Sequence, residues 1–179
     1  MMETCYILFG SNMGDKFTIF DQACTLINER CGKIVGLSSA YESEPWGFEA
    51  EEWFLNRLIV LETDLDPDRL MRQLLDIETE LGRVRFIGKI GYSSRTIDLD
   101  IIYYGDFVLH TVKVIAPHPR LHLRRFVLEP LCEVCPDFVH PVLQLTNREL
   151  LEQCEDKLAV RKCEISENYE ISVTLSSDR

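Results

Sequence analysis

Two aspartates within one apolar segment are the residues best suited to do chemistry. The segment reads SRTIDLDII from Ser94 to Ile102, with Asp98 and Asp100 two residues apart and Arg95 just before them. Side chains alternate along a strand, so both carboxylates are expected on one face, about 6.6 to 7 Å apart, while the apolar residues between them face the other way. Two unpaired buried carboxylates would be unfavourable, and a cation must therefore compensate them.

Two kinds of cation could do so, and the residues leave both open. Mg²⁺ takes one or two protein carboxylates and completes its shell with water and phosphate oxygens, and two such ions can clamp a transferring phosphoryl group. Alternatively, Asp98 and Asp100 pair with nearby arginines at a sheet edge. Three arginines close to the pair, Arg83, Arg85 and Arg95, favour the first interpretation. Arginine binds phosphate oxygens bidentately, and phosphoryl transfer depends on positioning and charge neutralisation.

The charge is unevenly distributed along the chain. The 179 residues carry a net charge of −11, which argues against a general nucleic-acid binder. Residues 83–125 hold eight basic and three acidic residues, a net +5, which leaves −16 for the remainder. A positive region in an acidic protein favours a small polyanionic ligand over solvated loops with chance charge. The sequence has no GxxxxGK[ST] loop, so a nucleotide is not expected to be held in that way.

Composition indicates one cytoplasmic domain. The chain is 46% hydrophobic and 27% charged, with no apolar run approaching the ~20 residues of a membrane helix and no signal-peptide pattern at the N-terminus. Seven cysteines, an odd number set mostly in apolar patterns, suit reduced thiols. Cys132 and Cys135 have zinc-like spacing, but no second pair matches them, which makes a metal role there the weaker alternative.

Apolar periodicity predicts the order β-α-β-β-α-β. Strands are expected at residues 5–9, 33–43, 54–64 and 96–103, and helices at about 16–31 and 65–82. Asp66 can cap the second helix, Pro67 suits its first position, and Gly82 ends it. This order gives an α+β fold, a ferredoxin-like plait in which an antiparallel sheet carries helices on one face.

Further elements are expected after this core. YGDFVLH (104–110) indicates a hairpin turn at Gly105–Asp106, and a short helix is expected near residues 126–135. The alternation in NYEISVTLS (168–176) suits an added edge strand or a segment ordered by a neighbouring chain. We therefore expect a single domain over residues 1–155 and a C-terminal extension over 156–179.

Five segments in order resemble the 6-hydroxymethyl-7,8-dihydropterin pyrophosphokinases, a family of folate biosynthesis. They are YILFGSNMGD, SSAYESEPWGFEAEEWFLN, LLDIETELGRVR, RTIDLDII and PHPRLHLRRFVLEPL. The resemblance covers roughly residues 5–151, and five ordered segments make it far more specific than any single motif. It implies an enzyme that moves the β,γ-diphosphate of ATP to the hydroxymethyl oxygen of the pterin and releases AMP, with two Mg²⁺ ions. We expect a monomer that binds these two small substrates, with no nucleic-acid or membrane partner.

The resemblance also assigns residues to the phosphate chemistry. It implies that Asp98 and Asp100 hold the two Mg²⁺ ions, that either could accept the hydroxyl proton, and that Arg83 and Arg95 stabilise charge on the transferring group. It implies an ATP-binding set made up of Glu78, Arg85, Tyr92, Ile101, Lys113, His118 and Arg124.

A second set of residues is implied for the pterin. It consists of Ser43, Glu44, Trp46, Phe54, Asn56 and Phe126. Phe54 and Phe126 match the aromatics that sandwich the ring, a contact worth about 0.5 to 1.5 kcal/mol beyond area burial. Asn56 matches the side chain that reads the amide edge of the pterin. Ordinary core packing is the alternative for the two phenylalanines.

The chain departs from the family pattern in places. Ser93 and Ser94 stand where Gly-Pro is frequent, Tyr92 where Trp is frequent, and Pro119 where some members carry Tyr. The loop from residue 83 to 95 is longer than in some members, and we expect it to close over bound substrates and exclude water.

Two other functions remain open from the residues alone. A different Mg²⁺-dependent transferase on the same plait, such as a nucleotidyl transferase, would release pyrophosphate. A non-enzymatic ligand-binding plait would have its Asp pair bound to arginine and no turnover to lose.

Overall fold

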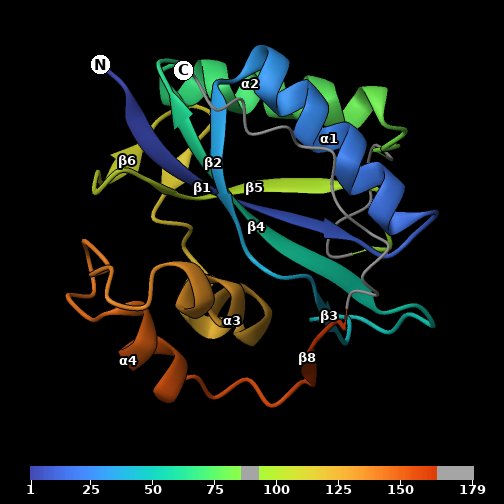
Figure 1. The fold of residues 1–179 in the computed structure, drawn as a ribbon. Helices are drawn as coiled ribbons and strands as arrows, with labels where there is room; N and C mark the ends of the chain where they lie inside the picture. The colour runs from blue at the N-terminus through green and yellow to red at the C-terminus, as the bar shows by residue number, and fades with distance from the viewer. Residues whose placement is uncertain (86–92, 165–179) are drawn as a thin grey trace.

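A six-stranded antiparallel sheet forms the centre of the part of the chain that the structure describes (Figure 1). The structure is a computed structural model that describes residues 1–85 and 93–164. The strands run in the order β5-β1-β4-β3-β8, with β2 also paired to β4. Their bounds are β1 (Glu3–Ser11), β2 (Lys33–Leu37), β3 (Tyr41–Ser43), β4 (Phe54–Thr63), β5 (Asp98–Tyr104) and β8 (Val160–Lys162).

Two helices cover one face of this sheet. They are α1 (Lys16–Arg30) and α2 (Pro67–Glu80), and the apolar side chains beneath them form the larger core. Asp15 and Asp66 accept backbone N–H groups in the first turns of the two helices, which fixes where each helix begins. The connectivity and strand order confirm the predicted α+β, ferredoxin-like plait.

The predicted strand at residues 33–43 is two strands, β2 and β3, because Ser38 interrupts it. The Ser38 Oγ accepts the Leu58 amide at 2.8 Å, and the Ser38 amide donates to the Leu58 carbonyl at 2.9 Å. Arg57 Nε donates to the Ser38 carbonyl at 2.7 Å. At Ser38 these bonds take the place of the regular ladder to β4, so β2 and β3 pair with β4 as two separate strands.

A second helical layer covers the opposite face of the sheet (Figure 1). It contains the 3-10 turn Leu121–Leu123, α3 (Arg125–Val134) and α4 (Asn147–Glu152). Alternation along β1 supplies both cores, since Ile7 and Phe9 pack beneath α1 and α2 while Leu8 packs beneath α3. The predicted helix near 126–135 is α3, but periodicity gave no indication of the face it covers.

The turn expected at Gly105–Asp106 forms, yet it does not make a hairpin with β5. Gly105 has a φ of 52°, and the Phe107 amide donates to the Tyr104 carbonyl. After this turn, β6 (Leu109–His110) pairs with the following strand β7 (Ile115–Ala116) in a separate two-stranded ladder. Thr111 stabilises that second turn by accepting the Val114 amide at 2.9 Å.

The C-terminal region adds a strand at the edge of the sheet. β8 pairs antiparallel with β3, whereas the strand expected at 168–176 lies outside the described residues. All seven cysteines are free thiols. Among residues 1–85 and 93–164, no helix is long and apolar enough to cross a membrane.

The second core should contribute strongly to stability. Leu131 on α3 is fully buried in it, so Leu131→Ala should lower the free energy of unfolding by about 2 to 5 kcal/mol. Leu143→Ala is the matched control because Leu143 is 39% exposed, and its cost should stay below about 0.5 kcal/mol. Urea unfolding measures both, and equal costs would contradict a packed second core.

Candidate active site

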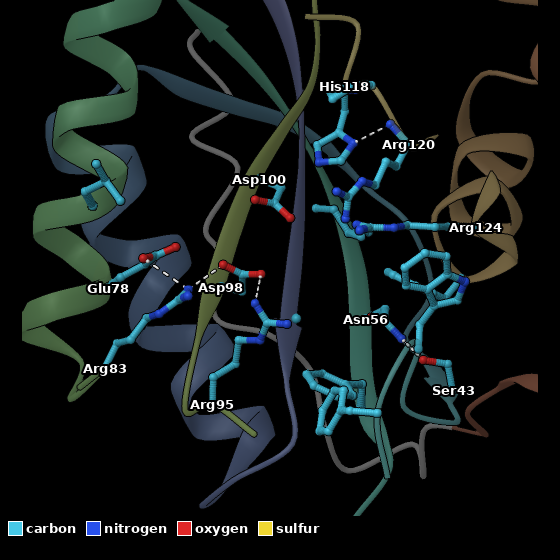
Figure 2. Close-up of a pocket in the computed structure, with 18 of the residues that line it drawn as sticks. Ser43, Asn56, Glu78, Arg83, Arg95, Asp98, Asp100, His118, Arg120 and Arg124 are labelled. Atoms are coloured by element: carbon cyan, nitrogen blue, oxygen red, sulfur yellow. Dashed lines mark hydrogen bonds and ion pairs between the residues drawn. The ribbon is translucent and has the colours of Figure 1, made fainter. Parts of the chain in front are cut away.

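One cavity of about 440 Å³ gathers most of the predicted site residues (Figure 2). It lies beside β1, β4 and β5 and is bordered by α2, the β3–β4 loop and the segment that leads into α3. The predicted residues that line it are Ser43, Glu44, Trp46, Phe54, Asn56, Glu78, Arg83, Arg85, Arg95, Asp98, Asp100, His118, Arg124 and Phe126.

Two of the predicted residues that the structure describes, Ile101 and Lys113, do not line the cavity. Ile101 is 4% exposed and packs in the core under α1 and α2, because strand alternation turns it away from its aspartate neighbours. Its side chain therefore cannot contact ATP, and only its backbone could. Lys113 lies in the exposed turn between β6 and β7. Tyr92 lies outside the described residues.

Asp98 is held by two arginines. Arg83 Nη1 pairs with one carboxylate oxygen, and Arg95 Nη1 binds the other at 2.7 Å. The side chains of Asp98 and Arg95 are each 19% exposed, and that of Arg83 is 14% exposed, so these are largely desolvated pairs. In this structure Asp98 is therefore compensated by arginines, the second of the two possibilities that the sequence left open.

Asp100 stands apart from those arginines on the same face of β5. The ion pairs of Arg83 and Arg95 go to Asp98, while Asp100 feels the charges of Arg95 and Arg124. Burial, and then repulsion from Asp98, raises the pKa of Asp100 to about 7. Asp100 is therefore the carboxylate whose charge is least compensated by the protein.

A third carboxylate, Glu78 on α2, joins the helix to the sheet. It is 1% exposed, and its Oε1 accepts the Leu99 amide at 2.7 Å. Its Oε2 pairs with Arg85 and lies 3.3 Å from Arg83 Nη1. Burial, followed by repulsion from Asp98, raises the pKa of Glu78 to about 7. Glu78 thus positions the two arginines of the loop as well as the strand that carries the aspartates.

His118 and Arg124 form the other polar wall of the cavity (Figure 2). His118 Nδ1 accepts the Arg120 amide at 3.1 Å, while burial and then the charge of Arg124 lower the pKa of His118 to about 4. His118 is therefore neutral at pH 7 with its proton on Nε2, which can donate to an anion. Arg124 is only 7% exposed, so its charge acts in a poorly solvated region.

The remaining wall is aromatic with a polar edge. Phe54 and Phe126 line it, and Asn56 Nδ2 donates to Ser43 Oγ at 2.7 Å. Asn56 is 1% exposed, so its amide is fixed in the cavity wall. A flat heterocycle with hydrogen-bonding groups along one edge suits such a surface.

Cations lie over these rings. The Arg124 guanidinium is 4.7 Å from the Trp46 ring and 5.7 Å from the Phe126 ring. The Arg95 guanidinium lies 5.6 Å from the Phe54 ring. The aromatic wall is therefore in contact with arginines that could bind phosphate. A reaction between a flat ring and a polyanion requires this arrangement.

Several lining residues were not predicted from the sequence. They are Leu8, Gly10, Phe48, Met71, Leu75, Pro119 and Arg120. Met71 and Leu75 could have been found, because they lie at helical spacing from Glu78 on α2. Gly10 gives no chemical signal, yet a Cβ there would lie 3.7 Å from Asn56 Oδ1.

The carboxylates suit a metal ion that is coordinated partly by the protein and partly by a bound ligand, rather than one coordinated by protein side chains alone. Among the described residues, no group of three or more His, Cys, Asp or Glu side chains is arranged to hold an ion. Asp98 and Asp100 supply hard oxygen donors on one strand face beside a cavity rich in arginine. This donor set suits Mg²⁺ that takes its other ligands from water and phosphate oxygens.

Comparison with known proteins defines the family. Residues 6–136 match the model for 7,8-dihydro-6-hydroxymethylpterin-pyrophosphokinase (HPPK). A 2-amino-4-hydroxy-6-hydroxymethyldihydropteridine pyrophosphokinase of Bacillus subtilis is 39% identical over 136 residues, or 75% of this chain and 80% of that protein. One from Porphyromonas gingivalis is 36% identical over 147 residues, 82% of this chain and 99% of that protein. The chain belongs to the HPPK family.

Longer proteins also contain this unit. The folic acid synthesis protein fol1 of Pneumocystis carinii is 38% identical over 154 residues, and the match spans 86% of this chain but only 20% of that protein. A crystal structure of an HPPK-DHPS protein in complex with substrates superposes with a TM-score of 0.70 at 15% identity. That superposition covers 84% of this chain and 43% of the other, and it confirms the fold.

The depressed pKa of His118 predicts a loss of stability in acid. An unfolded histidine titrates near 6.5, so the unfolded chain binds more protons between pH 6.5 and about 4, and the free energy of unfolding falls over that window. His118→Gln should remove this dependence, which amounts to on the order of 2 kcal/mol at pH 4.5. Urea unfolding at pH 7 and 4.5 measures it.

His110→Gln provides the control, because His110 is exposed on β6 and should leave the acid loss as in the unmodified protein. Parallel pH profiles for the unmodified chain and His118→Gln would contradict a neutral buried His118.

Proposed function

We propose that this chain transfers the β,γ-diphosphate of ATP to the hydroxymethyl group of 6-hydroxymethyl-7,8-dihydropterin and releases AMP, as a step of folate biosynthesis. The observation that carries the proposal is one cavity in which two strand aspartates lie among partly buried arginines, beside an aromatic wall with Asn56 at its polar edge. Membership of the HPPK family and the names of its relatives support the same reaction.

The two substrates have distinct places in this cavity. The pterin ring lies against Phe54 and Phe126, with its amide edge toward Asn56. The triphosphate lies toward His118 and Arg124, which supply a neutral N–H donor and a poorly solvated positive charge. The hydroxymethyl oxygen then faces the carboxylates of β5.

Charge neutralisation is the main contribution of the protein. Asp98 and Asp100 would hold two Mg²⁺ ions, which would supply positive charge that neutralises the triphosphate. Arg83 and Arg95 bind Asp98 in this structure, so both guanidiniums lie beside the carboxylates and would stabilise negative charge on the transferring group. Preorganised charges in a desolvated site stabilise the transition state without reorganising water. We further propose that the protein acts as a cytoplasmic monomer.

The product formed from ATP tests the proposal. The protein incubated with ATP, Mg²⁺ and the pterin alcohol should form AMP only when the pterin is present. Asp98→Ala and Asp100→Ala should each lower kcat by about 10² to 10³, the typical cost of removing one preorganised group. Release of pyrophosphate would instead support a nucleotidyl transferase. No turnover by well-folded protein would support a binding protein.

The aromatic wall gives a second expected outcome. Phe126→Ala should weaken pterin binding about tenfold or more, because each 1.4 kcal/mol of lost contact changes affinity tenfold. The affinity for an ATP analogue should stay within about twofold. Phe107→Ala is the matched control, since Phe107 is 46% exposed before β6 and does not line the cavity. Titration calorimetry measures each ligand, and equal loss of both ligands would contradict the assigned role.

A further inference from the structure

The pterin slot is the part of the cavity between Phe54 and Phe126, and its two walls are the β3–β4 region and the start of α3. The segment from Cys154 to Cys163, here named the C-terminal strap, bonds to both walls. It leaves α4, passes α3 and ends in β8 beside β3 (Figure 1). The match to the family model ends at residue 136, so the strap lies beyond it.

The strap holds the start of α3 through Asp156. Asp156 Oδ2 accepts the Arg125 amide at 3.0 Å, and the Asp156 carbonyl accepts Arg125 Nε at 3.0 Å. Arg125 stands between Arg124 and Phe126, which both line the cavity. A helix N-terminus has unsatisfied amides, and a carboxylate bound there fixes the entry of the chain into the helix. Asp156 therefore fixes the backbone that carries one wall of the slot.

The same strap holds the opposite wall through Glu44. The Ala159 amide donates to Glu44 Oε2 at 2.7 Å, and the Glu44 amide donates to the Ala159 carbonyl at 3.1 Å. Val160 then pairs with Ser43 in the β3–β8 ladder. Ser43 accepts the bond from Asn56, so the strap reaches the polar edge of the slot through one intermediate residue.

The short chain segment between these two anchors limits how far apart the walls of the slot can lie. Asp156 and Ala159 are three residues apart, and three residues span at most about 11 Å even when fully extended. The Asp156 carboxylate also accepts the Leu158 amide at 3.0 Å, which folds the connection locally. The two walls cannot move apart beyond this length while both anchors hold.

We propose that the C-terminal strap is a positioning element for the pterin slot, and that Asp156 is its main positioning residue. This inference rests on the proposed function for the identity of the ligand. Within the described residues, the strap bonds to the β3 end and the start of α3, whereas the ion pairs of Asp98 and Glu78 are made by Arg83, Arg85 and Arg95. Loss of the strap anchor should therefore weaken pterin binding more than ATP binding, since Arg124 is the one triphosphate-facing residue next to the anchored Arg125, and it should leave the chemistry in place.

The test compares Asp156→Ala with Asp156→Asn, which keeps an acceptor oxygen, and with Asp137→Ala. Asp137 is an 83% exposed aspartate paired with Arg148, which makes it a matched control away from the strap. Asp156→Ala should raise the pterin Kd and KM about tenfold and the ATP KM clearly less, with kcat at saturating substrates within twofold of the unmodified protein. Asp156→Asn should stay within about threefold, and Asp137→Ala should show no change.

A second variant keeps the test decisive if Asp156→Ala does not fold. Ala159→Pro removes the N–H that binds Glu44 and also fixes the backbone φ at residue 159, and it should raise the pterin Kd at least threefold. An unchanged pterin Kd in folded Asp156→Ala or Ala159→Pro would overturn the proposal, as would an equal rise in the ATP KM. Because the Kd is measured by calorimetry without turnover, unmodified protein that binds pterin but forms no AMP would overturn the proposed function alone.

Discussion

The crowding of three buried or partly buried carboxylates at one end of a sheet is the constraint on which the site depends. Glu78, Asp98 and Asp100 lie close enough that repulsion from Asp98 helps raise the pKa of the other two. Desolvated charge is unfavourable unless it is paired, so the arginines around this cluster are part of the fold. Arg83 lies between Glu78 on α2 and Asp98 on β5, and it thereby ties the helical layer to the strand that carries the site.

The same constraint prepares the site for a ligand that brings its own cations. Arg83 and Arg95 neutralise Asp98 in the structure described here, while Asp100 retains a raised pKa. A metal-bound triphosphate would supply positive charge to the carboxylates and negative charge to the arginines together. Such an exchange of partners would keep Asp98, Arg83 and Arg95 paired and would add a partner for Asp100. This explains why aspartates and arginines occur together on a face where either type alone would be unfavourable.

Much of this could be read from the sequence, because its signals were local and periodic. The helix bounded by Asp66 and Gly82 and the alternation around Asp98 and Asp100 gave the elements and the face that carries the site. Contacts made across long chain separations could not be read in this way. Glu78 binding the Leu99 amide, or Ser38 dividing one expected strand into two, requires the tertiary fold to bring the partners together. Neither has a signature in local spacing.

The central claim is that Asp98 and Asp100 bind a divalent ion together with the triphosphate. Titration of Mn²⁺ in place of Mg²⁺, followed by electron paramagnetic resonance, measures this directly in the presence of the pterin and a nonhydrolysable ATP analogue. Tight Mn²⁺ binding is expected only when the nucleotide is present, with at least a tenfold loss in Asp100→Asn. Equal Mn²⁺ binding by the unmodified protein and Asp100→Asn, with the nucleotide bound to both, would contradict the claim.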